Sequence, residues 1–534
     1  MHHHHHHGGS GTPSSQGTQN RFCRVALILG ALFILTVIPV TGHGKTRIPD
    51  TGQTQCFSDT GILSACPDAN ARYFGQDAQF QGPAMAYRDN GDGTVTDLVT
   101  GLMWSRAVDA RKVSLDDAQA MARNLALGGH NDWRVPNIKE LYSLINFSGS
   151  TMGQGHQGGA NTAIPYINTD YFNFKYGDTR AGERYIDAQW LSSTAYVSYT
   201  MDRNPTLFGV NFADGRIKGY GYAGRGPRGE KKFYVRFVRG NPYGANDFHD
   251  NGNGTVTDRA TGLMWSQADS QTPMTWAEAL AYANASRLGG YRDWRLPNAK
   301  ELQYIVDYTR SPDTTDSAAI DPVFSATQVT NEAGQKDFGH YWTSTTHMDG
   351  PRPDSAVTVC FGRAMGQMRG RVMDVHGAGA QRSDPKTGSN SIGRGPQGDA
   401  RHGRNYVRLV RGGEAELTLQ PAPQDRSAYP FVVKIDPGYE AIGSGNQTMG
   451  PGRSGGQMGS GPMGSNQMGG GQTGGPRFVE RLDRDGDGKV SSDEFDGPPQ
   501  HFKRFDRNRD GFISADEAPA GPPPGNGPPR MNDN

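Results

Sequence analysis

The sequence predicts an α+β chain made of two tandem copies of one domain, then a low-complexity linker and a small α-helical module. Three observations predict this organisation: motifs that recur at an offset of 161 residues, a Gly-rich stretch after residue 442, and two Asp-rich loops near the C-terminus. A repeat of this length is too long for a solenoid unit, so each copy is expected to be a globular domain.

The composition is that of a loop-rich protein. Hydrophobic residues make up 34% of the 534 residues, and the 74 Gly and 33 Pro are well above average usage. This argues against a helical bundle or a transporter. The 54 basic residues balance the 54 acidic residues, so we expect no nucleic-acid partner and no attraction to an anionic membrane surface.

The chain opens with a segment that predicts export. Residues 1–20 are an expression tag and linker, whose histidines are not a native metal site. Arg21 and Arg24 then precede a short apolar run, and residues 21–42 are therefore predicted to be a secretory signal peptide. A retained membrane anchor is the alternative, and an uncleaved anchor would be the chain's one association with a membrane. Both interpretations place the rest of the chain outside the cytosol.

An exported chain can form disulfides. Cys56 and Cys66 flank a turn-rich segment, so a local bridge between them is expected. Cys360 lies in a strand-like run without an obvious partner, and it is interpreted as a small buried hydrophobic residue.

Paired motifs define the two copies. The matching stretches are 89–97 with 250–258, 100–105 with 261–266, 132–137 with 293–298, 190–194 with 342–346, and 234–240 with 406–412. The offset drifts after the third pair, so insertions fall between motifs, in loops. We assign residues 46–240 to the first domain with an N-terminal extension, and residues 241–412 to the second domain.

Each copy begins with strand-like runs around a Gly-rich turn. A helix is then predicted to begin after Ser114 in the first copy and at the Thr275 capping box in the second. A second helix begins with Asn137 or Asn298, and short strands follow, ending with residues 233–238 in the first copy. Two helices followed by several short strands indicate an α+β domain with an antiparallel sheet.

Two Glu residues at these helix starts invite a catalytic interpretation, but capping explains them better. Glu140 and Glu301 each lie three residues after an Asn that follows Pro, which is the spacing of a capping box. Trp133 and Trp294 are interpreted as core residues and hydrogen-bond anchors rather than as a platform for carbohydrate.

The motifs DNGDGTVTD, TGLMW, DWR-hydrophobic-PN-x-KEL, W-x-SST and YVRxVRG resemble the Lcl C-terminal-domain family. The resemblance covers both copies, roughly residues 50–412. Domains of this family occur in exported bacterial proteins, and the founding member ends a collagen-like adhesin that binds glycosaminoglycans. The resemblance therefore implies an extracellular binding module. The layout also resembles the C-type-lectin-like fold, which includes the formylglycine-generating enzymes.

The second resemblance raises the question of catalysis. Formylglycine-generating enzymes use a pair of reactive cysteines, whereas the second copy has Cys360 alone and the first copy has none within its domain. Ser–His–Asp and zinc-ligand spacings do not stand out either. We therefore expect no enzymatic activity.

The acidic turn at the start of each copy is a candidate calcium site. The residues concerned are Asp89, Asp92 and Asp97 in the first copy, and Asp250, Asn253 and Asp258 in the second. Carboxylate and amide oxygens around two glycines can fold onto one hard cation. The alternative is an ordinary hairpin, because Asn-Gly and Asp-Gly favour type I′ turns.

The chain changes character after the second copy. Residues 413–442 are an extended segment with a strand-like run at 429–435. Residues 443–476 are a Gly/Met/Gln-rich linker, whose composition cannot bury enough surface to fold. Residues 477–518 resemble an EF-hand pair, and residues 519–534 are expected to be a disordered tail.

Both loops of this pair fill every ligand position of an EF-hand. The predicted calcium ligands are Asp483, Asp485, Asp487, Lys489, Ser491 and Glu494 in the first loop, and Asp506, Asn508, Asp510, Phe512, Ser514 and Glu517 in the second. Lys489 and Phe512 would contribute backbone carbonyls, and Val490 would pair with Ile513 across the loops. Two prolines shorten the helix that leaves the first loop, so a structural or docking unit is expected rather than a sensor-type groove.

The sequence therefore predicts a secreted or cell-surface, calcium-binding, non-enzymatic protein. Its tandem lectin-like domains are expected to bind an extracellular glycan or protein, as an adhesin does. The arginine-containing loops 225–228 and 394–397 are candidate contacts for anionic glycans, and solvated loops are the alternative. The other overall interpretation is a calcium-stabilised subunit that self-associates into an extracellular fibre, because residues 429–435 suit strand donation.

Overall fold

The computed structural model describes most of the two repeats and parts of the C-terminal region. The described residues are 46–107, 111–151, 162–224, 229–350, 352–395, 398–422, 433–434, 479, 482–484, 487–495 and 499–518. The predicted signal peptide, the linker 443–476, the tail 519–534 and the arginine loop 225–228 lie outside these residues. The predicted calcium ligand Asp485 also lies outside them.

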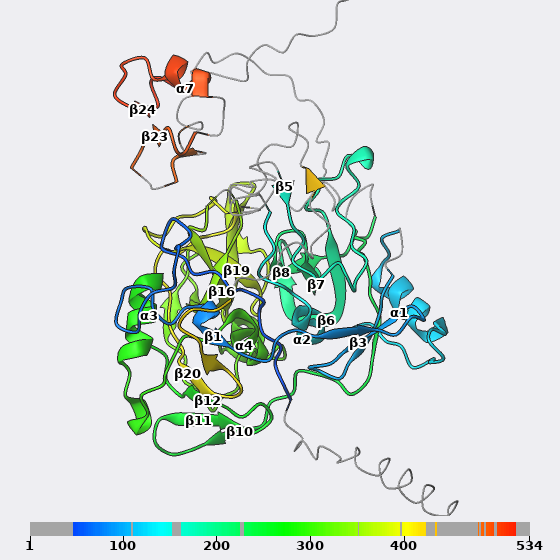
Figure 1. The fold of residues 1–534 in the computed structure, drawn as a ribbon. Helices are drawn as coiled ribbons and strands as arrows, with labels where there is room; N and C mark the ends of the chain where they lie inside the picture. The colour runs from blue at the N-terminus through cyan, green and yellow to red at the C-terminus, as the bar shows by residue number, and fades with distance from the viewer. Residues whose placement is uncertain are drawn as a thin grey trace, which may run out of the picture. The chain divides into compact units, whose positions relative to one another are not determined.

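Strands from the start and the end of each repeat form a four-stranded antiparallel sheet (Figure 1). In sheet order the strands are β2 (Tyr87–Asp89), β3 (Thr94–Asp97), β4 (Met103–Ser105) and β9 (Val238–Arg239) in the first repeat, and β10 (Phe248–Asp250), β11 (Thr255–Asp258), β12 (Leu263–Ser266) and β20 (Val410–Gly412) in the second. Gly91 and Gly93 have φ of 75° and 87°, which lets the chain reverse between β2 and β3. The last strand of the sheet pairs with β4 in the first repeat and with β12 in the second. The start and the end of each repeat therefore lie side by side.

Short helices follow the first hairpin at the predicted places. They are α1 (Leu115–Asn124), α2 (Ile138–Ser143), α3 (Trp276–Ala285) and α4 (Ala299–Tyr304). A further short helix, α5 (Pro312–Thr315), was not predicted. Ser114 and Thr275 cap α1 and α3 by accepting hydrogen bonds from backbone N–H groups in the first turn. Asn137 and Asn298 form complete capping boxes at α2 and α4. The predicted helix starts are therefore confirmed, but at Thr275 only half of the predicted capping box forms, and Glu278 pairs with Arg404 instead.

The later strands of both repeats join one six-stranded sheet. Its order is β15 (His340–His347), β16 (Ser355–Cys360), β19 (Gln381–Pro385), β8 (Arg216–Gly221), β7 (Asn204–Asn211) and β6 (Gln189–Thr200). β19 and β8 meet in the middle, where Gln381 pairs antiparallel with Ile217. The two copies that the sequence separates are thus joined by backbone pairing.

Short elements complete the described structure. The strand pairs are β1 (Phe80–Gln81) with β21 (Glu416–Leu417), β13 (Gln328–Thr330) with β14 (Lys336–Phe338), β17 (Met365–Met368) with β18 (Arg371–Asp374), β5 (Thr162–Ala163) with β22 (Val433–Lys434), and β23 (Val490–Ser491) with β24 (Phe512–Ile513). The remaining helices are α7 (Pro499–Phe505) and the 3-10 turns Asp77–Gln79, Thr179–Ala181 and Leu288–Gly290. The structure is mostly β-sheet with few helices.

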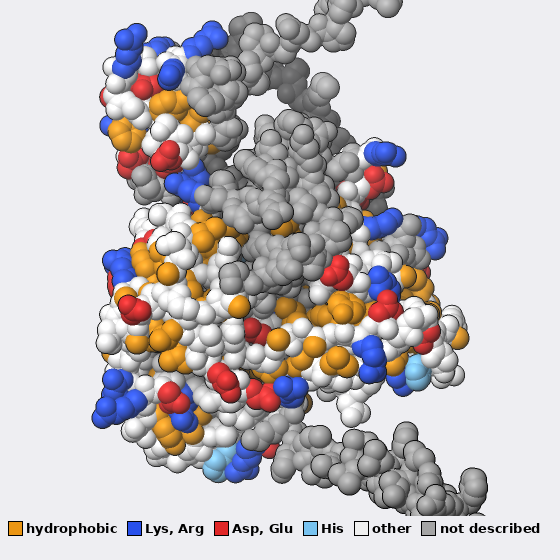
Figure 2. All heavy atoms as spheres, viewed as in Figure 1, with side chains coloured by type: hydrophobic (Ala, Val, Ile, Leu, Met, Phe, Trp, Pro, Cys, Tyr) orange, Lys and Arg blue, Asp and Glu red, His pale blue; other side chains and the backbone are white. Residues whose placement is uncertain are grey.

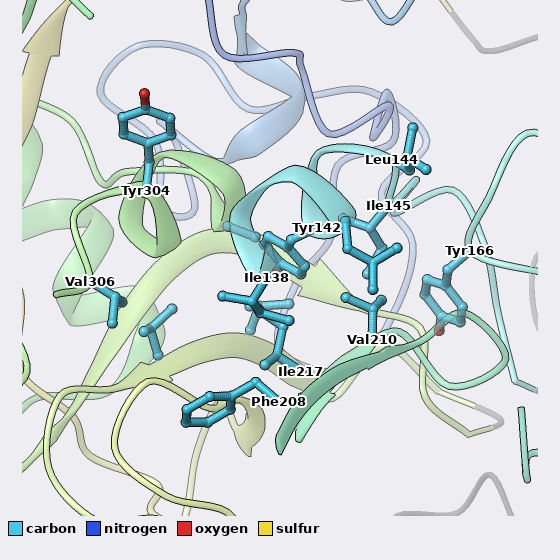
Figure 3. Packing of buried hydrophobic residues seen from close by; sticks show 14 of the residues in the cluster. Ile138, Tyr142, Leu144, Ile145, Tyr166, Phe208, Val210, Ile217, Tyr304 and Val306 are labelled. Carbon is cyan, nitrogen blue, oxygen red and sulfur yellow. The ribbon is translucent and has the colours of Figure 1, made fainter. Parts of the chain in front are cut away.

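One hydrophobic core draws on both repeats. Figure 3 shows Ile138 and Tyr142 of α2 close to Phe208, Val210 and Ile217 of the six-stranded sheet. The same cluster includes residues of the second repeat around the end of α4, such as those at 304–306. Burial of this apolar surface holds the two repeats together.

The N-terminal extension packs against the second repeat. Tyr73 stacks on Trp276 with ring centroids 6.1 Å apart, and the buried Asp77 accepts a hydrogen bond from Thr345. The predicted Cys56–Cys66 disulfide is formed within this extension and is therefore confirmed. Among the described residues, no helix has both the length and the apolar character that a membrane span needs.

Candidate metal sites

The two acidic loops at the C-terminal end are held together by a short antiparallel pair. Val490 of β23 lies opposite Ile513 of β24, as predicted, and both side chains are fully buried. They pack with Leu482 and Phe502 in a small separate core. This pairing sets the two loops back to back, the arrangement in which EF-hands stabilise one another.

In the second loop, predicted ligands converge. Ligand oxygens of Asp506, Asp510 and Glu517 all lie within 4.8 Å of one another. Backbone N–H groups of Asn508 and Ser514 hold the pKa of Glu517 below its usual range. The loop therefore brings together carboxylate oxygens, the ligands that a hard cation prefers.

The first loop has a matching hydrogen-bond network, but its described acids do not form a converged group like that of the second loop. Backbone N–H groups of Asp487 and Gly488 donate to Asp483 at 3.1 and 2.8 Å, as those of Asp510 and Gly511 do to Asp506 at 3.1 Å each. Ser491 donates its N–H and hydroxyl to Glu494, both at 2.7 Å. Of the residues predicted to contribute carbonyl ligands, Lys489 directly precedes β23 and Phe512 is the first residue of β24.

The turn glycines also follow the prediction. Gly488 and Gly511 have φ of 84° and 86°, a conformation that favours glycine. Helix α7 begins at Pro499 and ends one residue before Asp506, so it enters the second loop.

The acidic turn of the first repeat is arranged differently. Asp89 lies opposite Val95 and Asp97 lies opposite Tyr87, so the two acids are separated by two residues along the hairpin, about 7 Å. Asp89 forms an ion pair with Arg106 at 2.6 Å, and Asp97 accepts backbone N–H groups of the next turn. Asp92 accepts hydrogen bonds from Thr94.

The turn of the second repeat has the same arrangement, but the residues that donate hydrogen bonds to its first acid are neutral. Asp250 accepts hydrogen bonds from the N–H of Gly252 and from Gln267, and Asn253 accepts from Thr255. Asp258 accepts four hydrogen bonds from neighbouring loops. Hydrogen bonds within and around the hairpin thus occupy the oxygens of the second turn. In the first turn Asp97 Oδ2 is buried without a hydrogen-bond partner, and the three described acids there do not form a converged group. The calcium hypothesis for the turns stays a prediction.

Both Glu residues at the second-helix starts have structural contacts. Glu140 and Glu301 complete the capping boxes. Each also forms a two-point ion pair with an arginine, Glu140 with Arg134 and Glu301 with Arg295. The structural interpretation of both residues is confirmed, and so is the burial of the two matched Trp side chains, Trp133 and Trp294.

A third cluster, which sequence reasoning missed, lies in the second repeat. His340 of β15, Asp384 of β19 and His402 present ligand atoms within 4.8 Å of one another. Nδ1 of His340 is 2.8 Å from Asp384 Oδ2 and 3.3 Å from Nδ1 of His402. Burial alone would raise the pKa of Asp384, but the two histidines hold it below its usual range. The three residues are far apart in sequence, so no motif spacing revealed them.

The described residues include one cysteine outside the disulfide, Cys360, which is fully buried as predicted. Burial raises the pKa of its thiol well above the usual value, so the reactive thiolate is disfavoured.

Comparison with known proteins gives two family matches. The model of the Lcl C-terminal domain matches residues 93–239 and 254–376. An EF-hand model matches residues 480–496 and 500–517. No curated protein and no solved structure matches the chain.

Proposed function

The chain belongs to the Lcl C-terminal domain family, and from that premise we propose that it is an exported surface protein whose tandem repeats bind an extracellular ligand. The family indicates an exported protein, and the EF-hand match indicates calcium binding. The observation that carries the calcium part is the convergence of Asp506, Asp510 and Glu517 within the second of two paired loops. We also propose that each repeat has an α+β, C-type-lectin-like fold and that the protein is not an enzyme.

A cavity between the repeats supports ligand binding. Its volume is about 540 Å³, and Asn137 and Thr194 of the first repeat face it together with Asp307 and Asp321 of the second. Carboxylate and amide oxygens suit the hydroxyl groups of a sugar or the donors of a peptide. Since several carboxylates line this cavity, a neutral glycan or a basic peptide fits it better than a sulfated glycan.

The distribution of charge agrees with such a partner. Figure 2 shows Lys and Arg side chains interspersed with Asp and Glu over the face in view. Together with the formal net charge of zero, this mixture favours short-range recognition over attraction to a polyanion. No nucleic-acid partner is proposed, and membrane association is proposed only through an uncleaved N-terminal segment.

The fibre alternative rests on self-association through the extended segment. β22, the described part of residues 429–435, pairs antiparallel with β5 of the same chain. This segment therefore already has a partner strand, which favours the binding-protein proposal. Electron microscopy of the purified chain with and without calcium distinguishes the two, because regular filaments would support the fibre subunit.

The test of the proposal is binding of the tag-free chain to an array of neutral glycans, sulfated glycans and extracellular-matrix proteins. Specific binding should weaken in Asp307→Asn combined with Asp321→Asn. Asp170→Asn, an exposed acid outside this cavity, is the matched control. Binding restricted to sulfated glycans, or unaffected by the cavity variants, would contradict recognition at this cavity.

A further inference from the structure

The cluster of His340, Asp384 and His402 has the composition of a transition-metal site. Imidazole nitrogen suits zinc and its neighbours in the first transition row, and two imidazoles with one carboxylate form a common three-ligand set. The exposed fractions are 5% for His340 and 1% for Asp384, so two of the three side chains are buried. His402 is partly buried. Three converging ligands of these types, drawn from separate segments, need an explanation beyond folding.

The first repeat shows that the fold does not require the cluster. The matched Trp and Tyr motifs and the sheet register fix the equivalent positions, which are Ala188, Gly219 and Glu230 for His340, Asp384 and His402. None of the three ligand-type residues of the second repeat is therefore retained in the first. The first repeat folds without them, so the cluster is specific to the second repeat.

The distances between ligand atoms suit a tetrahedral ion. Ligands bound at about 2.0–2.1 Å in a tetrahedron stand about 3.3 Å apart. The Nδ1 atoms of His340 and His402 are 3.3 Å apart. Asp384 Oδ2 is 2.8 Å from His340 Nδ1, so it would move by roughly 0.5 Å to accept an ion. A rotation of the carboxylate suffices for such a shift.

Outer contacts orient the proposed ligands. Nε2 of His402 contacts Glu332, and when it donates its proton there the Nδ1 lone pair is directed to the cluster. Thr358 donates its hydroxyl to Asp384 at 2.8 Å, and the N–H of His402 donates to the other oxygen at 3.1 Å. A carboxylate behind a ligating histidine is the usual support in metal sites.

The cluster is reachable from outside. His340, His402 and Glu332 line a cavity of about 570 Å³. An ion could enter through this cavity, and water or a ligand atom from the cavity could fill a fourth position. We infer that the second repeat binds one divalent first-row transition-metal ion, of the zinc type, through His340, Asp384 and His402.

The test is titration of the full chain, freed of its His tag, with Co2+ and then Zn2+ in saturating calcium. Removing the tag excludes its own histidines, and calcium occupies the EF-hand loops. We expect one equivalent of Co2+ with the strong visible absorption of a tetrahedral site, displaced by one equivalent of Zn2+. Calorimetry then gives the affinity.

Matched variants locate the ion. His340→Ala, which installs the residue of the first repeat, and His402→Gln should abolish the visible band. Glu332→Gln should weaken binding about 10- to 100-fold, the usual effect of losing an outer partner. His249→Gln, an exposed histidine elsewhere, should bind like the unmodified chain.

Two results would overturn the inference. One is the absence of tight Co2+ binding to the unmodified chain, which would leave the cluster as a hydrogen-bonded network. The other is Co2+ binding by His402→Gln that is as strong as in the unmodified chain. The melting temperature of this variant without metal shows whether it is folded. Neither result bears on calcium or extracellular-ligand binding, so this inference fails independently of the proposed function.

Discussion

Lys300 of the second repeat donates a hydrogen bond to the backbone carbonyl of Ser143, 2.8 Å away, at the last residue of helix α2 in the first repeat. The relationship is reciprocal, because Lys139 of the first repeat donates to the carbonyl of Tyr304, the last residue of α4. Carbonyls at a helix end have no partner within the helix. Each repeat therefore caps a helix of the other with the lysine of its KEL motif.

We predict that Lys300→Met lowers the stability of the folded chain. Methionine keeps the length of the side chain but leaves buried carbonyls without a donor, which costs about 1–3 kcal/mol. Thermal unfolding should show a lower melting temperature, and Lys139→Met should act in the same direction. Lys232→Met, at an exposed position, is the control. Equal effects of all three changes would refute a capping role.

The two ion pairs of the capping boxes should differ in strength. The exposed fractions are 3% and 6% for Arg295 and Glu301, whereas Arg134 is 33% exposed beside a buried Glu140. Breaking a buried pair costs about 3–5 kcal/mol because it leaves an uncompensated charge. Glu301→Ala should therefore destabilise the chain by that amount, and Glu140→Ala by less. Denaturant unfolding measures both, and recovery of stability in Arg295→Met with Glu301→Leu would confirm the cause.

The buried Asp77 predicts a dependence of stability on pH. Burial raises the pKa of its carboxyl to about 8, and the neighbouring Asp50 adds to the shift. The folded state then holds the proton more tightly than the unfolded state. The stabilisation is complete below pH 4 and is lost as pH rises through 8, by at most about 1.4 kcal/mol per pH unit.

Asp77→Asn tests this dependence, since the amide keeps the shape without titrating. The melting temperature of the unmodified chain should fall relative to that of the variant between pH 5 and 8. Asp68→Asn, at an exposed position, should follow the unmodified chain. Parallel curves for the unmodified chain and Asp77→Asn would show that Asp77 does not carry the effect.

Short-range features of this structure were predictable from the sequence. The capping boxes at Asn137 and Asn298, the Cys56–Cys66 bridge and the Val490–Ile513 pair each depend on residues within one motif or on two copies of one motif. Their geometry follows from backbone hydrogen bonding and local chain reversal. A pattern of residue types is enough to specify them.

Long-range features were not predictable in this way. The pairing of Gln381 with Ile217 joins strands whose mutual register is set by packing of the whole chain. The cluster of His340, Asp384 and His402 is likewise assembled from separate segments by the sheet. The sequence did contain one indication of the cluster. At all three positions the first repeat has a different residue from the second.

The EF-hand loops predict two calcium sites in the full chain. Glu494→Gln and Glu517→Gln each remove a carboxylate oxygen from the last ligand position, where both oxygens normally bind the ion. Calorimetry should show the loss of one site in each variant and of both in the double variant. Asp493→Asn and Asp516→Asn change exposed neighbours outside the ligand positions and should retain binding. Unchanged binding in the double variant would exclude these loops.

The same double variant tests calcium at the repeat turns, because any remaining site must lie elsewhere. Calcium binding at the first turn would displace Arg106 from Asp89 and bring Asp92 toward the ion. Free calcium at a hundred times its dissociation constant would then stabilise the fold by about 2.7 kcal/mol. The predicted result is a melting temperature of Glu494→Gln/Glu517→Gln that is higher in calcium than in chelator. Adding Asp89→Ala and Asp250→Ala should remove that difference. Identical melting in calcium and chelator would assign the acids to hairpin hydrogen bonding, since the contacts of Asp258 with neighbouring backbone already account for its position.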